Sequence, residues 1–201
     1  MKKIFAVLIA AAVAGGAFAA GGDASERGVP TSPLKIYSGG LAGGFVNALN
    51  GDFKAAIGGD SGDAGSILAK LTFTNSWEFV PGISLFCDVS WYFPGSNKLN
   101  FGGDLGVDYY LSQSRFSPFV GVGGGVHYFD RKGVDDFGEE FGGSFTGHAG
   151  FALEMTETVQ VRFRVPYHFV IMGGGKQYHG VGVDVGVMFM SKLRNVRQLH
   201  Y

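Results

Sequence analysis

The residues of this chain that could do chemistry are mainly histidines, arginines and carboxylates, set among glycine and valine. His127, His148 and His168 together would suit zinc, because imidazole nitrogen is one of its preferred ligands. They come from different segments, and the sequence does not give their relative heights. We therefore predict no metal and no cofactor, and we expect each histidine to hydrogen-bond a buried neighbour rather than act as a base.

Glycine runs match nucleotide-binding motifs only in part. The segment GGSFTGHA, which begins at Gly142, has the two glycines of a phosphate-binding loop but lacks the lysine and the hydroxyl residue that should follow. The segment GVGGGV, which begins at Gly121, breaks the dinucleotide pattern at its last position. The chain has 16 basic and 17 acidic residues and a net charge of −1, so nothing suggests a nucleic-acid partner.

The chemistry-bearing residues lie in segments where apolar side chains alternate with glycine, polar or charged ones. In the segment 157–171, for example, Arg162 and Arg164 alternate with Val161 and Phe163. A period of two is typical of β-strands, whose successive side chains point to opposite faces. Eight segments have this pattern: 34–47, 66–79, 82–93, 98–112, 117–130, 140–154, 157–171 and 178–190.

The number and spacing of these segments predict an all-β fold, an eight-stranded antiparallel up-and-down transmembrane β-barrel. The connections alternate between short and long, as in barrels with short periplasmic turns and longer outer loops. After the N-terminal region, no segment approaches 18 continuous apolar residues, the length that would indicate a membrane-spanning helix. The apolar rows should face lipid, because Arg162 and Arg164 on that side would each cost roughly 2–4 kcal/mol near the midplane. A soluble barrel of the lipocalin kind, with its faces reversed, is the alternative.

The polar face of the strands would fill a narrow lumen, since eight strands leave little free space inside. Unpaired charges there would be costly, so we predict a hydrogen-bonded network. Its predicted members are Lys70, Glu78, Asp88, Asp104, Asp108, His127, His148, Glu154, Arg162, Arg164, His168 and Asp184. Aromatic belts are predicted at the two membrane interfaces, with Trp77, Trp91, Phe93, Tyr109, Tyr128, Tyr167, Phe169 and Phe189 as their members. Pro166 should produce a bulge or bend, because proline removes a ladder donor.

The first residues have the order of a secretory signal peptide. Lys2 and Lys3 precede an apolar run, and Ala17-Phe18-Ala19 supplies a cleavage pattern. The predicted division of the chain is a cleaved signal peptide at 1–19, an N-terminal extension at 20–33, the barrel at 34–190 and a periplasmic tail at 191–201. We therefore expect the mature protein in the outer membrane of a Gram-negative bacterium.

The strand pattern resembles that of the small outer-membrane barrels, the family that includes the transmembrane domain of outer membrane protein A. The likeness is carried by SPFVGVGGGVHYF from Ser117, MTETVQVRFRVPYHF from Met155 and the closing GVGVDVGVMF from Gly180. It covers nearly the whole mature chain and implies outer-membrane insertion, with a role in adhesion, envelope integrity or small-solute passage. The chain departs from the family after Phe189, where a basic tail follows the residue that should end the last strand.

Some barrels of this size are lipid A acylation or deacylation enzymes, and the deacylase type uses a histidine and a serine two residues apart on a strand. No such pair occurs here; His127, for instance, is followed two residues later by Phe129. We therefore predict a protein that is not an enzyme, with a structural or adhesive role at the cell surface. The alternatives left open are a narrow channel for small solutes or ions, a lipid-modifying enzyme and the soluble lipocalin-like binding barrel.

The surface role would reside in outer loops at 48–65, 94–97, 130–139 and 172–177, which are rich in glycine and aspartate. We expect outer-membrane lipid as one partner, and a surface ligand at the first, third or fourth of these loops as another. We expect no nucleic-acid partner and a monomeric barrel.

Overall fold

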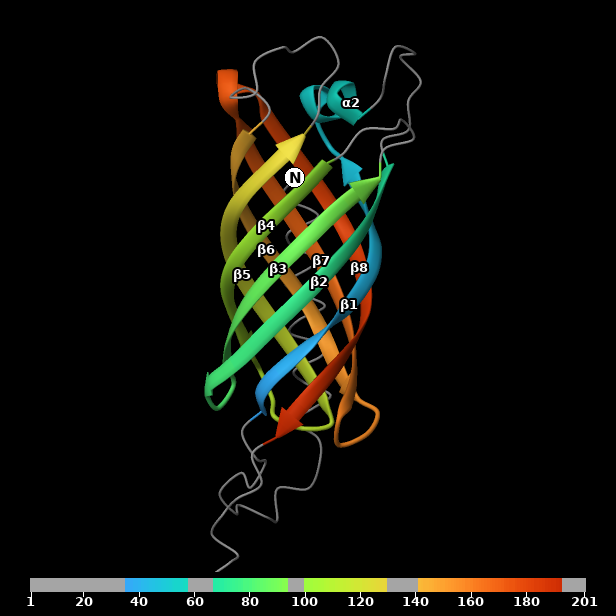
Figure 1. Ribbon diagram of the computed structural model, residues 1–201, viewed down its shortest axis with the longest axis vertical. Helices are drawn as coiled ribbons and strands as arrows, with labels where there is room; N and C mark the ends of the chain where they lie inside the picture. Colours follow the sequence, from blue (N-terminus) through green and yellow to red (C-terminus); the bar gives the residue numbers. More distant parts are fainter. Residues whose placement is uncertain (1–34, 58–66, 94–99, 130–140, 193–201) are drawn as a thin grey trace, which may run out of the picture.

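The computed structural model describes residues 35–57, 67–93, 100–129 and 141–192, and it shows a closed β-barrel (Figure 1). Each strand pairs antiparallel with the next one along the chain, and the last strand pairs with the first to close the barrel. The strands are β1 (Lys35–Ala48), β2 (Ile67–Val80), β3 (Ile83–Phe93), β4 (Asn100–Tyr110), β5 (Phe116–Phe129), β6 (Phe141–Glu154), β7 (Val159–Met172) and β8 (Gln177–Lys192). The predicted all-β barrel is confirmed, and each strand begins and ends within two residues of its predicted range.

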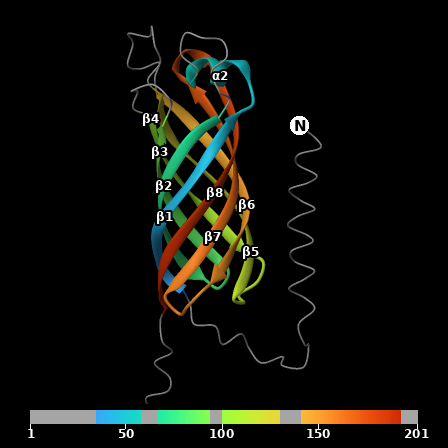
Figure 2. The same cartoon turned by 90° about the vertical axis from the view of Figure 1, so that its right-hand side faces the viewer.

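Alternating side chains give the barrel an apolar outside and a polar inside. Val126 and Leu105 on the outside are 63% and 65% exposed, whereas Arg162 and Arg164 are only 6% and 5% exposed. The strands run obliquely around the barrel (Figure 2), and closure pairs the backbone without leaving a free sheet edge to lipid. The faces are therefore those of a membrane barrel and are opposite to those of the soluble alternative.

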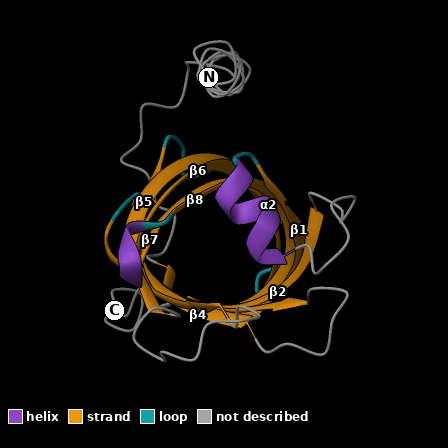
Figure 3. Ribbon diagram, turned by 90° about the horizontal axis from the view of Figure 1, so that it is seen from above, coloured by secondary structure: helices purple, strands orange, loops and turns teal. Residues whose placement is uncertain are grey.

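The two ends of the barrel differ. Short turns at 81–82, 111–115 and 155–158 join strands at one end, called here the periplasmic end because short turns lie there in outer-membrane barrels. The other end, called the outer end, carries the helix α2 (Gly51–Ile57) and the 3-10 turn η1 (Gly173–Gly175). Seen from above, α2 lies across the mouth of the barrel (Figure 3).

The segment 48–65, predicted as a loop, contains helix α2. Asn50 starts this helix: its side-chain Oδ1 accepts a hydrogen bond from the backbone N–H of Phe53 at 3.4 Å, and its carbonyl accepts one from Lys54 at 3.1 Å. The Phe53 ring then stacks on Tyr178, with ring centroids 5.2 Å apart. A helix of this length depends on such tertiary contact, because short helices are marginal alone. None of the helices in the described ranges has the length and apolar character needed to cross a membrane.

Pro166 does not produce the predicted bulge. The β6–β7 pairing continues through it opposite His148, and the β7–β8 register is the same before and after it. Within this stretch of the β7–β8 ladder, only Val165 and Pro166 have no partner in β8. The absence of a backbone N–H at Pro166 is therefore accommodated without a register shift.

Several predicted segments lie outside the described residues. They are the signal peptide at 1–19, the extension at 20–33 and the loops at 94–97 and 130–139. The predicted tail begins within the barrel, because β8 continues to Lys192.

Candidate functional site

The lumen holds three layers of polar side chains, and the layer nearest the periplasmic end centres on Asp108. Arg162 donates a hydrogen bond to one carboxylate oxygen of Asp108, and His148 Nε2 lies 2.6 Å from the other. The Arg162 guanidinium also lies over the Phe119 ring, 4.2 Å from its centroid. Because a buried charge is costly unless it is paired, this group ties β4, β6 and β7 together.

In the middle layer, Arg164 bridges two carboxylates. Its Nη1 lies 2.5 Å from Asp88 Oδ2, and its Nη2 lies 3.1 Å from Asp184 Oδ2. Lys70 Nζ donates to the same Asp184 oxygen at 2.8 Å. These ion pairs join side chains from β2, β3, β7 and β8, so they cross the lumen and occupy its width.

The layer nearest the outer end is built from histidine, aspartate and hydroxyl groups. Asp104 accepts a hydrogen bond from the Ser144 hydroxyl at 2.6 Å, and His127 Nε2 lies 3.2 and 3.3 Å from its two oxygens. His168 stands beside them, with Nδ1 3.1 Å from the Thr146 hydroxyl oxygen. Asp104, His127 and His168 each bring one ligand atom to within 4.8 Å of the other two. These three residues are called the outer cluster.

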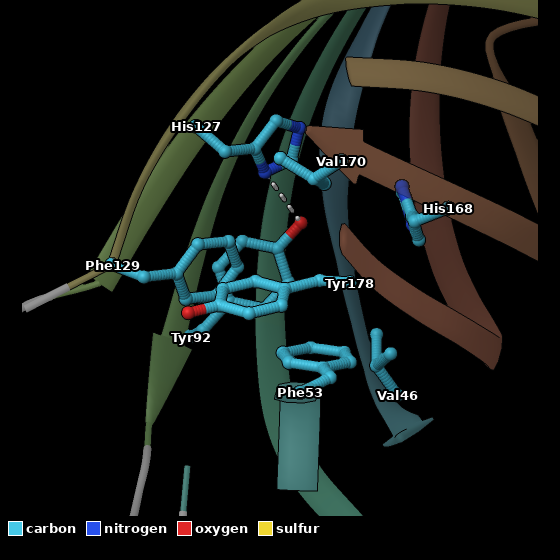
Figure 4. Close-up of a pocket in the computed structure, with 8 residues that line it drawn as sticks. All are labelled: Val46, Phe53, Tyr92, His127, Phe129, His168, Val170 and Tyr178. Carbon is cyan, nitrogen blue, oxygen red and sulfur yellow. Dashed lines mark hydrogen bonds between the residues drawn. The ribbon is translucent and has the colours of Figure 1, made fainter. Parts of the chain in front are cut away.

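Aromatic rings close the lumen on the outer side of the outer cluster, and they lie below His127 and His168 in the view of Figure 4. Phe53 from α2 stacks on Tyr178, and both rings contact Phe129 edge-on with centroids 5.6 Å apart. Tyr92 packs against Phe129 at 5.5 Å. Phe53, Tyr92, Phe129 and Tyr178 are called the aromatic cap. Between this cap and the outer cluster remains a cavity of about 10 Å³, which is space for about one water molecule.

Most residues predicted for the lumen network meet in these layers. Those buried in the lumen are Lys70, Asp88, Asp104, Asp108, His127, His148, Arg162, Arg164, His168 and Asp184. Glu78 and Glu154 instead lie half-buried at the periplasmic end, where Glu78 accepts a hydrogen bond from the backbone N–H of Gly82 at 2.8 Å. The three histidines considered as a zinc set do not converge, because His148 belongs to the Asp108 group.

Glycines on the inner face give these side chains their space. A Cβ atom on Gly102 would overlap the His127 ring. One on Gly121 would overlap both Asp108 and His148. The bare inner face of β4 and β5 is therefore a steric requirement of the polar layers.

The predicted aromatic belts lie on the lipid-facing side at both ends. Toward the outer end are Trp91, Phe93, Tyr128, Tyr167 and Phe169, and toward the periplasmic end are Trp77, Tyr109 and Phe189. Aromatic rings are enriched at both membrane interfaces of outer-membrane barrels, and the assignment of these residues to such belts stays a prediction.

His179 was not among the predicted site residues, and its side chain has the opposite orientation to those of the lumen histidines. Among the described histidines, His179 is the one on the lipid-facing side, near the outer end of β8. Its Nδ1 lies 2.7 Å from the Tyr167 hydroxyl oxygen, and its ring centroid lies 4.7 Å from that of Phe169. Its backbone N–H donates to Asn50 Oδ1 at 3.2 Å. The signal was present in the alternation of β8, where His179 shares the face of Val181. We call His179, Tyr167, Phe169 and Asn50 the outer rim site.

The lumen contains serine, histidine and aspartate, the residue types of a serine hydrolase, but they are not arranged as in a catalytic triad. Ser144 donates to Asp104, whereas an activated serine needs a hydrogen bond to the base that takes its proton. Phe129 takes the serine position of the His-x-Ser pattern and lies in the aromatic cap. The lumen therefore does not present a serine nucleophile to a substrate.

Comparison with protein families gives one match. Residues 65–169, more than half of the 201-residue chain, match the family described as lipid A 3-O-deacylase (PagL). The matched region includes His127, Ser144 and Tyr167 and ends before His179. The prediction that the chain is not an enzyme is wrong on this finding, because the family is one of deacylases. No curated protein sequence matches the chain.

Solved structures similar to the barrel are small outer-membrane proteins. Neisserial surface protein A superposes with a TM-score of 0.60 at 12% identity, over 77% of this chain and 97% of its own. The N-terminal barrel domain of OprF from Pseudomonas aeruginosa gives a TM-score of 0.54 at 11% identity, over 77% and 97% of the two chains. These similarities confirm the fold of an eight-stranded outer-membrane barrel.

Proposed function

Because the chain belongs to the lipid A 3-O-deacylase (PagL) family, we propose that it removes an ester-linked acyl chain from lipid A in the outer leaflet. The observation that carries this proposal is the lipid-facing histidine His179, held beside Tyr167 at the outer end. The reaction takes place on the outside of the barrel, at the outer rim site.

The position of the substrate favours the outside. The acyl chains of lipid A lie in the bilayer, so their ester groups meet side chains that face lipid near the outer end. The lumen, in contrast, is filled by ion pairs and closed by the aromatic cap, with a cavity of only about 10 Å³ beneath it. A glycolipid does not fit such a space, whereas the residues of the outer rim site are partly exposed, and three of them lie on the lipid-facing side.

The contacts of His179 prepare it to act as a base. Tyr167 holds Nδ1, Phe169 packs on the ring, and Asn50 fixes the backbone. When Nδ1–H donates to the tyrosine oxygen, Nε2 carries a lone pair, and among the described residues nothing hydrogen-bonds to Nε2. A base oriented by a third group in this way is the usual arrangement for activating a nucleophile.

Water serves as the nucleophile, since the chain lacks the His-x-Ser pair. Nε2 of His179 takes a proton from the water, whose oxygen attacks the carbonyl carbon of the ester. The bond from that carbon to the sugar oxygen then breaks, and the proton passes to the departing oxygen. The products are a free fatty acid and a sugar hydroxyl group.

Two cations on elements next to the outer end of β8 suit the phosphate groups of lipid A. Lys54 lies in α2, which packs against β8, and Lys176 lies just before β8 begins. Both residues are exposed. A lysine ammonium binds phosphate as a point charge, so this pair would hold the headgroup while the acyl chains stay against the barrel wall.

The proposal is tested by the mass of lipid A from Gram-negative cells that express the full chain. Cells with the wild-type barrel should yield lipid A that lacks one acyl chain. His179→Gln should reduce this product by roughly 10²–10⁴-fold, the usual contribution of a general base. Tyr109→Phe is the matched control, because Tyr109 is a lipid-facing tyrosine at the opposite end, and it should leave the product unchanged.

Folding is checked in each strain by the shift in gel mobility on boiling. Unchanged lipid A mass with folded wild-type barrel would refute deacylation. Equal product from wild type and His179→Gln would refute the role of the outer rim site.

The surface-binding role expected from the outer loops stays a prediction. The loops at 94–97 and 130–139 lie outside the described residues, as does the part of 48–65 beyond Ile57. The channel alternative is not favoured, since the ion pairs and the aromatic cap both support a closed lumen.

A further inference from the structure

We propose that the outer cluster, Asp104, His127 and His168, binds a divalent transition metal, with zinc as the preferred ion. This site lies inside the barrel below the aromatic cap and is separate from the outer rim site. It does not depend on the proposed deacylation.

The geometry of the cluster fits one ion. The ligand atoms come from β4, β5 and β7 and lie within 4.8 Å of one another. In a tetrahedral zinc site with bonds of about 2.0–2.1 Å, neighbouring ligand atoms lie roughly 3.3 Å apart. Ion binding would therefore require the three side chains to move closer together by rotation about their χ angles.

An unsatisfied nitrogen gives independent support for a ligand. His168 Nε2 is buried and has no hydrogen-bond partner, while its Nδ1 is held by the Thr146 hydroxyl at 3.1 Å. A buried polar atom left without a partner costs about 1–3 kcal/mol. Metal ligation by Nε2 would remove that cost.

The Nδ1 atoms of His127 and His168 lie near hydroxyl groups, and metal-bound histidines usually have a hydrogen-bond partner at the ring nitrogen that does not bind the metal. His127 Nδ1 lies 3.4 Å from the Tyr92 hydroxyl oxygen, the contact drawn as a dashed line in Figure 4. His168 Nδ1 lies at the Thr146 hydroxyl. Such outer contacts fix the ring orientation and leave Nε2 as the ligand atom. A bound metal would take the place of the contact between His127 Nε2 and the Asp104 carboxylate.

The charge of the Asp104 carboxylate also supports a cation at the outer cluster. Asp88, Asp108 and Asp184 each form an ion pair with arginine or lysine. Among the described residues, Asp104 has only His127 and Ser144 as hydrogen-bond partners. A buried carboxylate without a permanent cation is unfavourable, and a divalent ion would supply the missing positive charge.

The chemical type of the ligand atoms and the size of the neighbouring cavity favour zinc over other divalent ions. Two imidazoles and one carboxylate suit zinc, whereas magnesium and calcium prefer an all-oxygen set. The cavity of about 10 Å³ that borders His127 and His168 has about the size of one water molecule, which would serve as the fourth ligand. Bound metal would link β4, β5 and β7 inside the outer half of the barrel and would stabilise the folded state.

The test uses the full barrel, refolded in vesicles and stripped of metal with a chelator. Zinc titration with elemental analysis should give one ion per chain. Cobalt should give the intense visible absorption of a four-coordinate site with nitrogen ligands. His168→Gln and Asp104→Asn should each weaken zinc binding by about tenfold or more, and His179→Gln is the matched control that should bind as the wild type does.

Binding that is the same in His168→Gln, or weakened equally by His179→Gln, would overturn the proposal. If a cluster variant does not refold, the wild-type cobalt spectrum decides, and the absence of a four-coordinate band would overturn the site. Failure here leaves deacylation untouched, because that reaction is read from lipid A mass and from His179→Gln.

Discussion

At the scale of single residues, the charges of the lumen are balanced in specific groups rather than as a general mixture. Arg164 is shared by Asp88 and Asp184, and Lys70 adds a second cation to Asp184. Each partner is nearly inaccessible to solvent. Removal of one member therefore leaves an uncompensated buried charge, which costs more than the pair itself contributes.

Arg164→Met should lower the free energy of unfolding by about 3–5 kcal/mol. The substitution leaves the buried Asp88 carboxylate without its ion-pair partner and removes one of the two cations that pair with Asp184. Urea unfolding of the refolded barrel in vesicles measures the change. Arg115→Met is the control, since Arg115 is exposed in a periplasmic turn, and its effect should stay below about 1 kcal/mol. Equal effects of the two substitutions would contradict the buried network.

The partners within the lumen could be predicted only in part. Alternation assigned Arg162 and Asp108 to the inner face, and the structure brings them together. The alternation could not show that His127 lies close to His168 while His148 lies beside Asp108. The position of a side chain along the barrel axis depends on the register between strands, which alternation does not give. A lipid-modifying enzyme was predicted only as an alternative, because the sequence lacks the His-x-Ser pair of the deacylase type.

At the scale of elements, the strands follow from their patterns, while the outer end does not. The period of two fixed the strand ranges to within two residues. Helix α2 has only seven residues, and contacts of Phe53 with Tyr178 and Phe129 hold it. Those partners lie far away in the chain, so local sequence does not reveal the helix.

Inner glycines are the feature of the strands that the structure explains most directly. Gly121→Ala should destabilise the barrel by about 1–3 kcal/mol, because its Cβ would overlap Asp108 and His148. Gly147→Ala on the neighbouring strand is the matched control, since a Cβ there meets nothing within 4 Å. Both are measured by urea unfolding, and a Gly147→Ala barrel that is as unstable as Gly121→Ala would speak against the packing argument.

At the scale of the whole molecule, both proposed sites depend on whether each row of side chains faces lipid or the lumen. With the apolar rows outward, His179 meets the outer leaflet and the outer cluster is enclosed. With the faces reversed, His179 would be enclosed and the arginines of β7 would stand outside. Both proposals would then fail together, because each depends on the side of the barrel that these residues face.

Cys87 provides the most direct measurement of that orientation. It is the single cysteine of the chain and lies on the lipid-facing row of β3, between Leu85 and Val89. A nitroxide spin label attached to this native residue in the refolded barrel should collide readily with dissolved oxygen and rarely with a water-soluble nickel complex. An immobile label that neither reagent reaches, or one reached mainly by the nickel complex, would contradict the lipid-facing orientation of this row.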